Sequence, residues 1–507
     1  MKDPISNRFS RTLGLLAAAS VALAACAPAP TPAPTAPAPT SAPAAPAATA
    51  VPAPTAAPAP TKAPDPTKVP EPTKAPEAKP FVTWLQYDEK NEDPKNDEAV
   101  GNAYFRGSIP KFNAEFAGKY KWVNQPQPFA KLTTSLVAAV QAGGDVPDLA
   151  QGNGGDIAQF SKTGTVQDLT DWAKQQSWFA TLDPAAIKDC TGKDGKIYCI
   201  PLASSPALVF YWKDNFPNGY PKTADEFLKQ AAELKKKNVY AITYFGSTAF
   251  NGDAAGRYFW SVVSSFGGQY DDGAGKMLLN TPANVKAAEF MRKVVADGYS
   301  SESVFLGDFK EEEDLKGLDP KKPFAASFPT GIFGYRYIQP VKSPAGKQYG
   351  KDFDPTGGPI LQAIADGAMG IAPMFTGGDA TTPSCGFGTA GYVIPKGAKN
   401  PDAAKAYINW LFDPKNGIEW VQKPGGGFPT SKVLLADKAF DTPFYKQAAA
   451  ATAGICKSWQ TSIQDGALAR KIIAGAFFDI IKGKDSKNAD IAGVLQKAQD
   501  EFNKTVK

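Results

Sequence analysis

The chain has 507 residues, with 55 lysines and arginines against 50 acidic residues, 45 prolines, five cysteines and no histidine. The absence of histidine excludes Ser-His-Asp and Cys-His catalytic sites and histidine-ligated zinc. An enzyme with this sequence would depend on carboxylates, lysine, tyrosine or a bound cofactor. The formal charge of +5 is small for this length and gives no reason to expect nucleic-acid binding.

The N-terminus has the pattern of an export signal. Basic residues precede an apolar run from Leu13 to Ala25, which is shorter than the about 20 residues that a membrane-spanning helix needs. The run ends in Leu-Ala-Ala-Cys, which resembles the lipobox of bacterial lipoproteins. We therefore expect residues 1–25 to be a lipoprotein signal peptide, and lipid on Cys26 to anchor the chain to the extracellular face of the cell membrane, or to the periplasmic side where a second membrane is present. The alternative is an ordinary secretory signal that happens to contain a cysteine.

Proline makes up a third of the next segment, with 18 prolines among the 54 residues from Ala27 to Pro80. Such a segment has too few large apolar side chains to form a core, and it favours extended polyproline II. We predict that residues 26–80 form a lipidated, disordered stalk; a proline-rich ligand for a recognition domain is the alternative. Residues 81–507 remain, which is too long for one hydrophobic core, so we expect two lobes or domains.

The four cysteines beyond Cys26 indicate disulfide bonds, because their number is even and the chain is exported. Four cysteines allow three pairings. Cys190 and Cys199 bracket an Asp-Gly hairpin-turn signal, so we pair them locally, and Cys385–Cys456 is then the remaining pair. A metal site is disfavoured because the sequence has no Cys-x-x-Cys spacing and no histidine.

Strand and helix patterns alternate along the rest of the chain, which predicts an α/β fold with a parallel sheet. Threonines at 223 and 281 are expected to cap helices, the second followed by a proline, and Gly298 is expected to end one. The expected strands are 81–85, 119–125 and two apolar runs within 195–214 that Pro201 and Pro206 interrupt. The expected helices are 109–118, 129–143, 223–237, 281–298, 400–414 and 486–506.

Short motifs occur in a characteristic order and spacing over nearly all of residues 81–507, and together they indicate a protein family. The series resembles the extracellular solute-binding proteins of bacterial ABC importers, in particular the carbohydrate-binding family 1 with its maltose- and glycerol-phosphate-type receptors. The motifs are Gly144–Leu149, Gly195–Pro201, Tyr211–Asp214, Pro221–Phe227, Ser265–Gly268, Asp366–Ile371, Gly391–Gly397 and Asn400–Ala404.

The resemblance implies a non-enzymatic receptor that captures a solute by lobe closure and delivers it to a membrane permease. It implies a two-lobed, type II periplasmic-binding-protein-like α/β fold with hinge strands and an interlobe cleft. No cofactor, metal or nucleic acid is expected, and the chain is expected to be a monomer. The stretch 300–358 is longer than is usual in the family. The implied segments are 81–203 and 386–433 for lobe I, and 206–382 and 438–507 for lobe II.

A saccharide cleft needs aromatic rings that stack on the C–H faces of a sugar and planar polar groups that bind its hydroxyls. We expect these residues on loops at the C-terminal ends of strands. The family resemblance adds two positions, a site where a stacking tryptophan is frequent and a glycine-rich loop at the cleft edge. The predicted ligand-binding residues are Trp84, Tyr87, Asp88, Asn153, Asp156, Arg257, Trp260, Phe375, Gly426 and Phe428.

Several alternatives stay open at this stage. Trp84 also fits a core position, and Asn153 with Asp156 also fits an Asx turn and helix cap. The aromatic residues and few charges in the expected cleft favour an uncharged or weakly charged mono- or oligosaccharide over a polyamine, nucleoside or peptide. A surface glycoside hydrolase would need two carboxylates across a sugar cleft, for which Asp88 and Asp156 are a possible pair. A cell-surface adhesin would explain the stalk but not the internal motifs.

Overall fold

The computed structural model describes residues 77–96, 98–248, 253–307, 310–383, 385–453, 456–458, 463, 466–482 and 490–506. All of them belong to one compact unit, Lys74–Lys507. The signal peptide, Cys26 and the stalk up to residue 76 lie outside the described residues. The folded part begins slightly earlier than predicted, because Lys79 and Pro80 are the first residues of strand β1. A proline is tolerated there because it stands near the beginning of the strand.

A nine-stranded sheet runs through the described part of the chain, with the order β10-β4-β9-β3-β1-β2 along its main path. β1 pairs in parallel with β2 and β3, as the alternating pattern predicts. β9 is antiparallel to both β3 and β4, so the sheet is mixed rather than fully parallel. The strands on this path are β1 (Lys79–Trp84), β2 (Tyr120–Asn124), β3 (Leu149–Asn153), β4 (Ile200–Trp212), β9 (Cys385–Val393) and β10 (Phe428–Pro429).

β4 is one long strand, although two runs broken by proline were expected. Its register on β9 shifts between Pro201 and Ala203, and Pro206 is its last residue paired with β9. From Ala207 onward it pairs instead with β5 (Ser327–Gly331) and β8 (Met369–Ala372). The two prolines thus lie at a bulge and at the change of partner, where a lost backbone donor is tolerated. β4 therefore connects two separate sets of strands.

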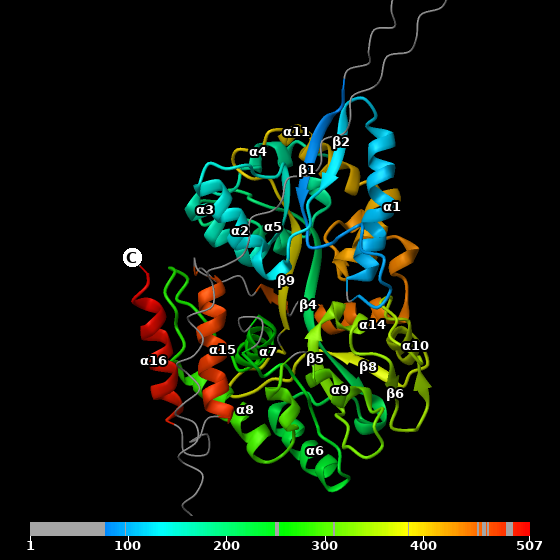
Figure 1. Cartoon of the computed structure of the whole chain (residues 1–507). Coiled ribbons are helices and arrows are strands. Elements are labelled where there is room, and N and C mark those ends of the chain that lie inside the picture. The colour runs from blue at the N-terminus through cyan, green and yellow to red at the C-terminus, as the bar shows by residue number, and fades with distance from the viewer. Residues whose placement is uncertain are drawn as a thin grey trace, which may run out of the picture. The chain divides into compact units, whose positions relative to one another are not determined.

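We call the part around β1–β3, β10 and the β4–β9 pair lobe I, and the part around β5, β8 and the second half of β4 lobe II. In Figure 1, β4 and β9 run side by side between these two groups of elements. Pro206, where β4 changes partner, is also the first residue of the segment 206–382 that the family resemblance implies for lobe II. The helices of lobe I are α1 (Ala99–Glu115), α2 (Phe129–Gln141), α3 (Ile157–Thr163), α4 (Thr170–Lys174), α5 (Pro184–Asp189), α11 (Pro401–Leu411), α12 (Pro414–Trp420) and α13 (Lys432–Leu435).

The C-terminal helices of the chain pack on earlier helices of lobe II. α15 packs on α7, α8 and α16. The helices of lobe II are α6 (Ala224–Lys236), α7 (Asp253–Ser265), α8 (Pro282–Ala296), α9 (Lys310–Lys316), α10 (Gly358–Ala365), α14 (Pro443–Thr452), α15 (Gly466–Lys482) and α16 (Ile491–Asn503). The remaining strands are β6 (Val341–Lys342), β7 (Gln348–Tyr349) and β11 (Cys456–Ser458). Within the described residues, no helix is both long and apolar enough to cross a membrane.

Local signals in the sequence explain several helix ends. The Thr223 hydroxyl accepts a hydrogen bond from the backbone of Glu226, and the Thr281 hydroxyl accepts one from Asn284. Gly298 follows α8 with a φ of 69°, a left-handed conformation that glycine adopts without strain. α1 was only partly predicted: it begins at Ala99 and continues through Pro110. The aromatic residues of α1 that pack into the core outweigh the weak local signal at its start.

The predicted hairpin between Cys190 and Cys199 is present, and its ends are joined by a disulfide bond. The backbone N–H of Gly192 donates to the carbonyl of Lys196, and Gly195 has a positive φ of 77° in the turn. Cys385 is also disulfide-bonded, and it faces Cys456 in the register of β9 on β11. The side chain of Cys456 lies outside the described part of the chain, so the Cys385–Cys456 bond stays a prediction.

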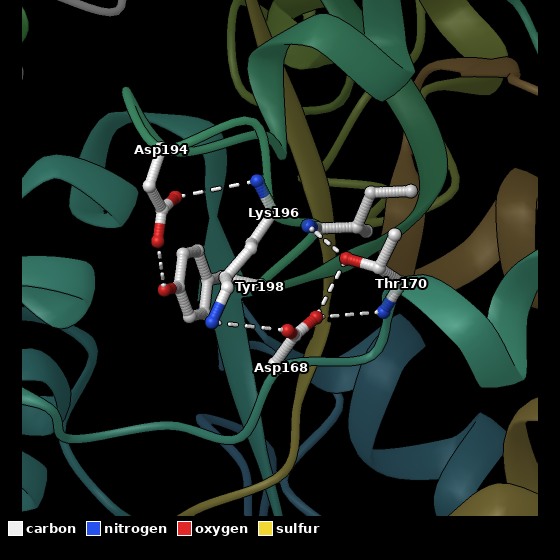
Figure 2. Close-up of polar contacts among 6 residues, drawn as sticks. Asp168, Thr170, Asp194, Lys196 and Tyr198 are labelled. Carbon is white, nitrogen blue, oxygen red and sulfur yellow. Dashed lines mark hydrogen bonds and ion pairs between the residues drawn. The ribbon is translucent and has the colours of Figure 1, made fainter.

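A polar network fixes this hairpin to the segment before α4 (Figure 2). Asp168 Oδ1 accepts hydrogen bonds from the backbone N–H and the hydroxyl of Thr170, and its Oδ2 lies 3.4 Å from Lys196 Nζ. The Tyr198 hydroxyl donates to Asp194 at 2.7 Å. Burial and the Asp194 carboxylate raise the pKa of Tyr198 to about 12. The network and the disulfide together hold the residues that lead into β4.

Candidate functional site

Tyr87 is the first predicted site residue that the structure places at the boundary of the lobes. It follows β1, its ring stacks on Phe105, and its hydroxyl donates to the carbonyl of Pro424 at 2.7 Å. Burial raises the pKa of Tyr87, so the phenol is neutral at physiological pH. Tyr87 thereby fixes the glycine-rich loop 425–427 beside the end of β1.

The other side of this boundary is formed by a short helix, Ile332–Arg336, that directly follows β5. The side chain of Arg336 is 7% exposed, and its Nη1 donates to the carbonyl of Lys423 at 2.5 Å. The guanidinium carbon lies 5.6 Å from the centre of the Tyr337 ring. Lys423 belongs to lobe I and Arg336 to lobe II, so this hydrogen bond joins the two lobes.

Position 426 requires a glycine, because of its backbone conformation and because of the atoms around it. Its φ is +59°, and a Cβ at this position would lie 2.5 Å from Arg336 Nη2 and 3.1 Å from Phe333 Cβ. The next residue, Gly427, packs against the backbone of Ser204 in β4. A larger side chain at Gly426 would push against the lobe II helix, and one at Gly427 would push against the connecting strand β4. The loop that was predicted as a cleft edge therefore lies where the lobes meet.

A second contact between the lobes involves the predicted pair Asn153 and Asp156 at the end of β3. Asn153 Nδ2 lies 3.4 Å from Asp156 Oδ2, and the Asp156 side chain is buried. Burial raises the pKa of Asp156, against the opposing effects of Arg470 and of the hydrogen bond from Asn153. Arg470 lies on α15 of lobe II, so lobe I presents a buried carboxyl group to a lobe II cation here.

Two other predicted residues after β1 make local polar contacts. Trp84 is partly buried, and its Nε1 donates to Gln125 Oε1 at 3.0 Å. Asp88 Oδ1 accepts from the backbone N–H of Lys90 at 3.0 Å, which is an Asx turn. Neither contact crosses to lobe II, so a role of these two residues in binding stays a prediction.

The structure places Phe375 and Trp260 away from the Tyr87 and Gly426 contacts. Phe375 is 1% exposed and packs on Tyr220, Phe227 and Phe290 in the core of lobe II. A stacking role for Phe375 would require this packing to open, so we do not include Phe375 in the proposed site.

Trp260 is also buried, with its ring against Tyr270 and against the backbone of Gly386 in β9. It therefore supports the connecting strand from the lobe II side. Arg257 lies on α7, and its side chain is outside the described part of the chain. Phe428 is partly exposed and contacts Tyr445 of α14, so it also links lobe I to lobe II.

Sequence reasoning missed the segment 332–337. Phe333 and Tyr337 are partly exposed and contact each other with ring centres 6.3 Å apart, on either side of the buried Arg336. The signal was present, since one arginine stands among aromatic residues directly after a Thr-Gly strand end. The segment lies in the stretch 300–358, which is longer than is usual in the family, so the family motifs give no guide to it. Within the described residues, no group of three potential metal ligands occurs.

Comparisons with known proteins agree with this architecture. A model of the bacterial extracellular solute-binding proteins, numbered family 8, matches residues 108–453. The chain belongs to this family. The family is defined by solute binding rather than by catalysis, as expected, although its number differs from the family 1 that the motifs suggested.

Individual relatives of this solute-binding protein are distant. An arabinooligosaccharide-binding protein of Bacillus subtilis (strain 168) is 22% identical over 296 residues, which are 55% of this chain and 59% of that relative. The matched region thus spans less than two thirds of the relative's length.

Two solved structures share the fold. One is an ABC transporter solute-binding protein of Thermotoga lettingae with bound α-D-tagatose, with a TM-score of 0.65, 18% identity, and coverage of 84% of this chain and 99% of that chain. The other is maltose-bound MalE3 of T. maritima, with a TM-score of 0.64, 16% identity, and coverage of 84% and 100%. The two-lobed periplasmic-binding-protein fold predicted from the motifs is therefore confirmed.

Proposed function

We propose that this solute-binding protein is the receptor of an ABC importer, and that it captures a mono- or oligosaccharide by closing its two lobes. The observation that carries the proposal is a pair of interactions across the lobes, the hydrogen bond from Arg336 to the carbonyl of Lys423 and the electrostatic effect of Arg470 on the buried Asp156. Both contacts lie beside the loops that follow β1, β3 and β5. A ligand that touches both lobes stabilises the closed state, because it gains its full set of contacts only there.

The proposed binding residues combine rings and polar groups in the manner that sugar recognition requires. The partly exposed Phe333, Tyr337 and Phe428 supply aromatic surface, the buried Tyr87 holds the loop beside them, and Arg336 supplies hydrogen-bond donors. The relatives support a saccharide ligand, since one is an arabinooligosaccharide-binding protein and the two solved structures hold α-D-tagatose and maltose. The chain has no histidine, and solute capture needs no proton transfer.

The test is a thermal-shift and calorimetry screen of the purified protein against maltose, D-tagatose, arabino-oligosaccharides and other mono- and oligosaccharides. A true ligand should stabilise the protein by RT ln(1 + [L]/Kd), about 2.7 kcal/mol at one hundred times Kd. The bound sugar should be recovered unchanged by chromatography. Accumulation of cleaved sugar would favour a hydrolase, and an absence of any stabilising saccharide would contradict the proposal.

We also propose that lipid on Cys26 tethers the receptor to the outer face of the membrane, with the proline-rich segment as a spacer. The lipobox-like Leu-Ala-Ala-Cys sequence supports this anchor. In cells, Cys26→Ser should release the protein from the membrane fraction, whereas the double variant Cys190→Ser with Cys199→Ser, which lacks a disulfide but keeps Cys26, should stay there. Retention of the Cys26→Ser protein in the membrane fraction would contradict the anchor.

A further inference from the structure

The loop Gly154–Asp156, which directly follows β3, is fixed in place within lobe I. A Cβ on Gly154 would overlap the carboxylate of the buried Asp189. That carboxylate also accepts a hydrogen bond at 3.0 Å from the backbone N–H of Thr389, which belongs to the connecting strand β9. Beside the loop, Asn153 Nδ2 donates to Asp156 Oδ2 at 3.4 Å. Lobe I therefore presents the Asp156 carboxyl group from a defined position.

Helix α15 of lobe II meets this loop at its N-terminal end. A Cβ on Gly466, the first residue of α15, would lie 3.5 Å from the carbonyl oxygen of Gly155. Arg470 follows one turn later on the helix, and its Nη1 lies 3.9 Å from the position of a Cβ on Gly155 and 3.4 Å from that of a Cβ on Gly466. The two glycines thus let the lobe II helix and its arginine come close to the lobe I backbone.

The charges of the two lobes are complementary at this contact. Burial raises the pKa of Asp156, whereas the positive charge of Arg470 acts in the opposite direction and stabilises the ionised carboxylate. The N-terminal end of α15 adds a partial positive charge on the same side. Because an electrostatic interaction is mutual, the ionised Asp156 attracts Arg470 and α15 as strongly as they stabilise its charge. The interaction therefore draws lobe II toward the fixed loop of lobe I.

We propose that Asp156 and Arg470 form an electrostatic latch that holds the two lobes in contact before a solute binds. Both charged groups belong to the chain itself, so their attraction acts whenever the lobes meet. Arg470 is then a positioning residue that sets the population of the closed state. A solute would add its contacts to a closure that is already populated, which lowers the conformational cost of capture. The inference goes beyond the proposed function, because it concerns the equilibrium of the lobes without solute.

The experiment is pulsed electron paramagnetic resonance on the full chain at pH 7.5, after unfolding and refolding in non-reducing urea to remove any copurified solute. Spin labels are attached through Lys174→Cys on α4 and Lys229→Cys on α6, two exposed positions in different lobes, with Cys26→Ser to leave no label there. With Arg470 present, a short interlobe distance should be populated. Arg470→Met should lower the ratio of short to long distances about fivefold or more, because the carboxyl partner is buried and weakly screened. In an Asp156→Asn background, the effect of Arg470→Met should fall below about twofold.

Lys471→Met is the matched control, because it removes the same charge from the neighbouring, exposed residue of α15 and should leave the ratio unchanged. Urea unfolding shows whether each variant is folded, and Arg470→Gln replaces Arg470→Met if the latter fails to fold. Equal distance distributions with and without Arg470, or an equal effect of Lys471→Met, would overturn the latch. An undiminished effect of Arg470→Met in the Asp156→Asn background would overturn the pairing of these two residues. Each of these results leaves saccharide binding standing, because the thermal-shift screen tests it separately.

Discussion

Replacement of Gly426 by alanine should weaken the contact between the lobes. The residue has a φ of +59°, and the added Cβ would lie 2.5 Å from Arg336 Nη2. The guanidinium cannot yield freely, because Nη1 is bound to the carbonyl of Lys423. Phe333 Cβ at 3.1 Å limits movement on the other side. We therefore expect either loss of the Arg336–Lys423 hydrogen bond or separation of the lobes.

The size of the effect follows from two contributions. A non-glycine residue in the left-handed region costs roughly 1–2 kcal/mol. Loss of a hydrogen bond from a charged donor costs about 1.5–3 kcal/mol. Gly426→Ala should therefore lower the free energy of unfolding by about 2.5–5 kcal/mol, because the hydrogen bond between the lobes is lost whether the guanidinium moves or the lobes separate.

Gly164→Ala is a matched control for the backbone contribution. Gly164 has a φ of +62°, and a Cβ there would meet nothing within 4 Å. This variant should lose only the roughly 1–2 kcal/mol of backbone strain. Urea unfolding of both variants measures the difference, and small-angle scattering detects lobe separation as a larger radius of gyration.

A double variant tests whether the clash with Arg336 causes the difference in unfolding free energy between Gly426→Ala and Gly164→Ala. In an Arg336→Met background, the clash is relieved, so Gly426→Ala should cost no more than Gly164→Ala does. Equal unfolding free energies for the two single alanine variants, without a change in radius of gyration, would refute the reasoning. The contact of Arg336 with the loop would then contribute nothing to lobe association.

Three further predictions concern stability. Cys190→Ser together with Cys199→Ser opens a short loop and should lower the free energy of unfolding by about 2.5 kcal/mol in chemical denaturation. Thr223→Ala removes the cap of α6 and should cost about 1 kcal/mol by the same measurement. Asp156 has a raised pKa when folded, so the wild type should lose stability as the pH rises above 3.8 through that pKa, and Asp156→Asn should lack this loss. Thermal melts of the wild type and Asp156→Asn between pH 4 and 8 measure the difference in stability between these two proteins, which should be larger at pH 7 than at pH 4.

Each of these three predictions would be contradicted by a specific result. An unchanged denaturation midpoint for the double serine variant would mean that the polar network around Asp168 holds the hairpin without the disulfide. Thr223→Ser should retain the cap, so an equal loss in Thr223→Ser and Thr223→Ala would assign the effect to the lost methyl group. Parallel pH profiles for the wild type and Asp156→Asn would show that this carboxyl does not titrate differently on folding.

The parts of the fold that were predicted from sequence depend on local chemistry. The Thr223 and Thr281 caps, the Cys190–Cys199 hairpin and the strand at 81–85 each follow from a few adjacent residues. The continuous β4 was not predicted, because its prolines are tolerated only through a bulge and a change of partner that distant strands determine. Local patterns do not contain that information.

The candidate site was predicted only in part for the same reason. Tyr87 and Gly426 follow from strand-end and glycine-loop patterns, and the structure brings both loops together through the Tyr87–Pro424 hydrogen bond. Phe375 has the expected residue type but packs inside lobe II. The role of Arg336 depends on its hydrogen bond to Lys423, 87 residues away in the chain, and no local pattern reveals that contact.

The central claim is that a saccharide binds between the lobes and draws them together. Small-angle scattering of the full chain during titration with the best saccharide from the screen tests it most directly, with Gly426→Ala measured in parallel. We predict a saturable decrease in radius of gyration that follows the calorimetric binding curve and that Gly426→Ala shifts to higher ligand concentration. Saturable binding with no change in radius of gyration in either protein would contradict the account.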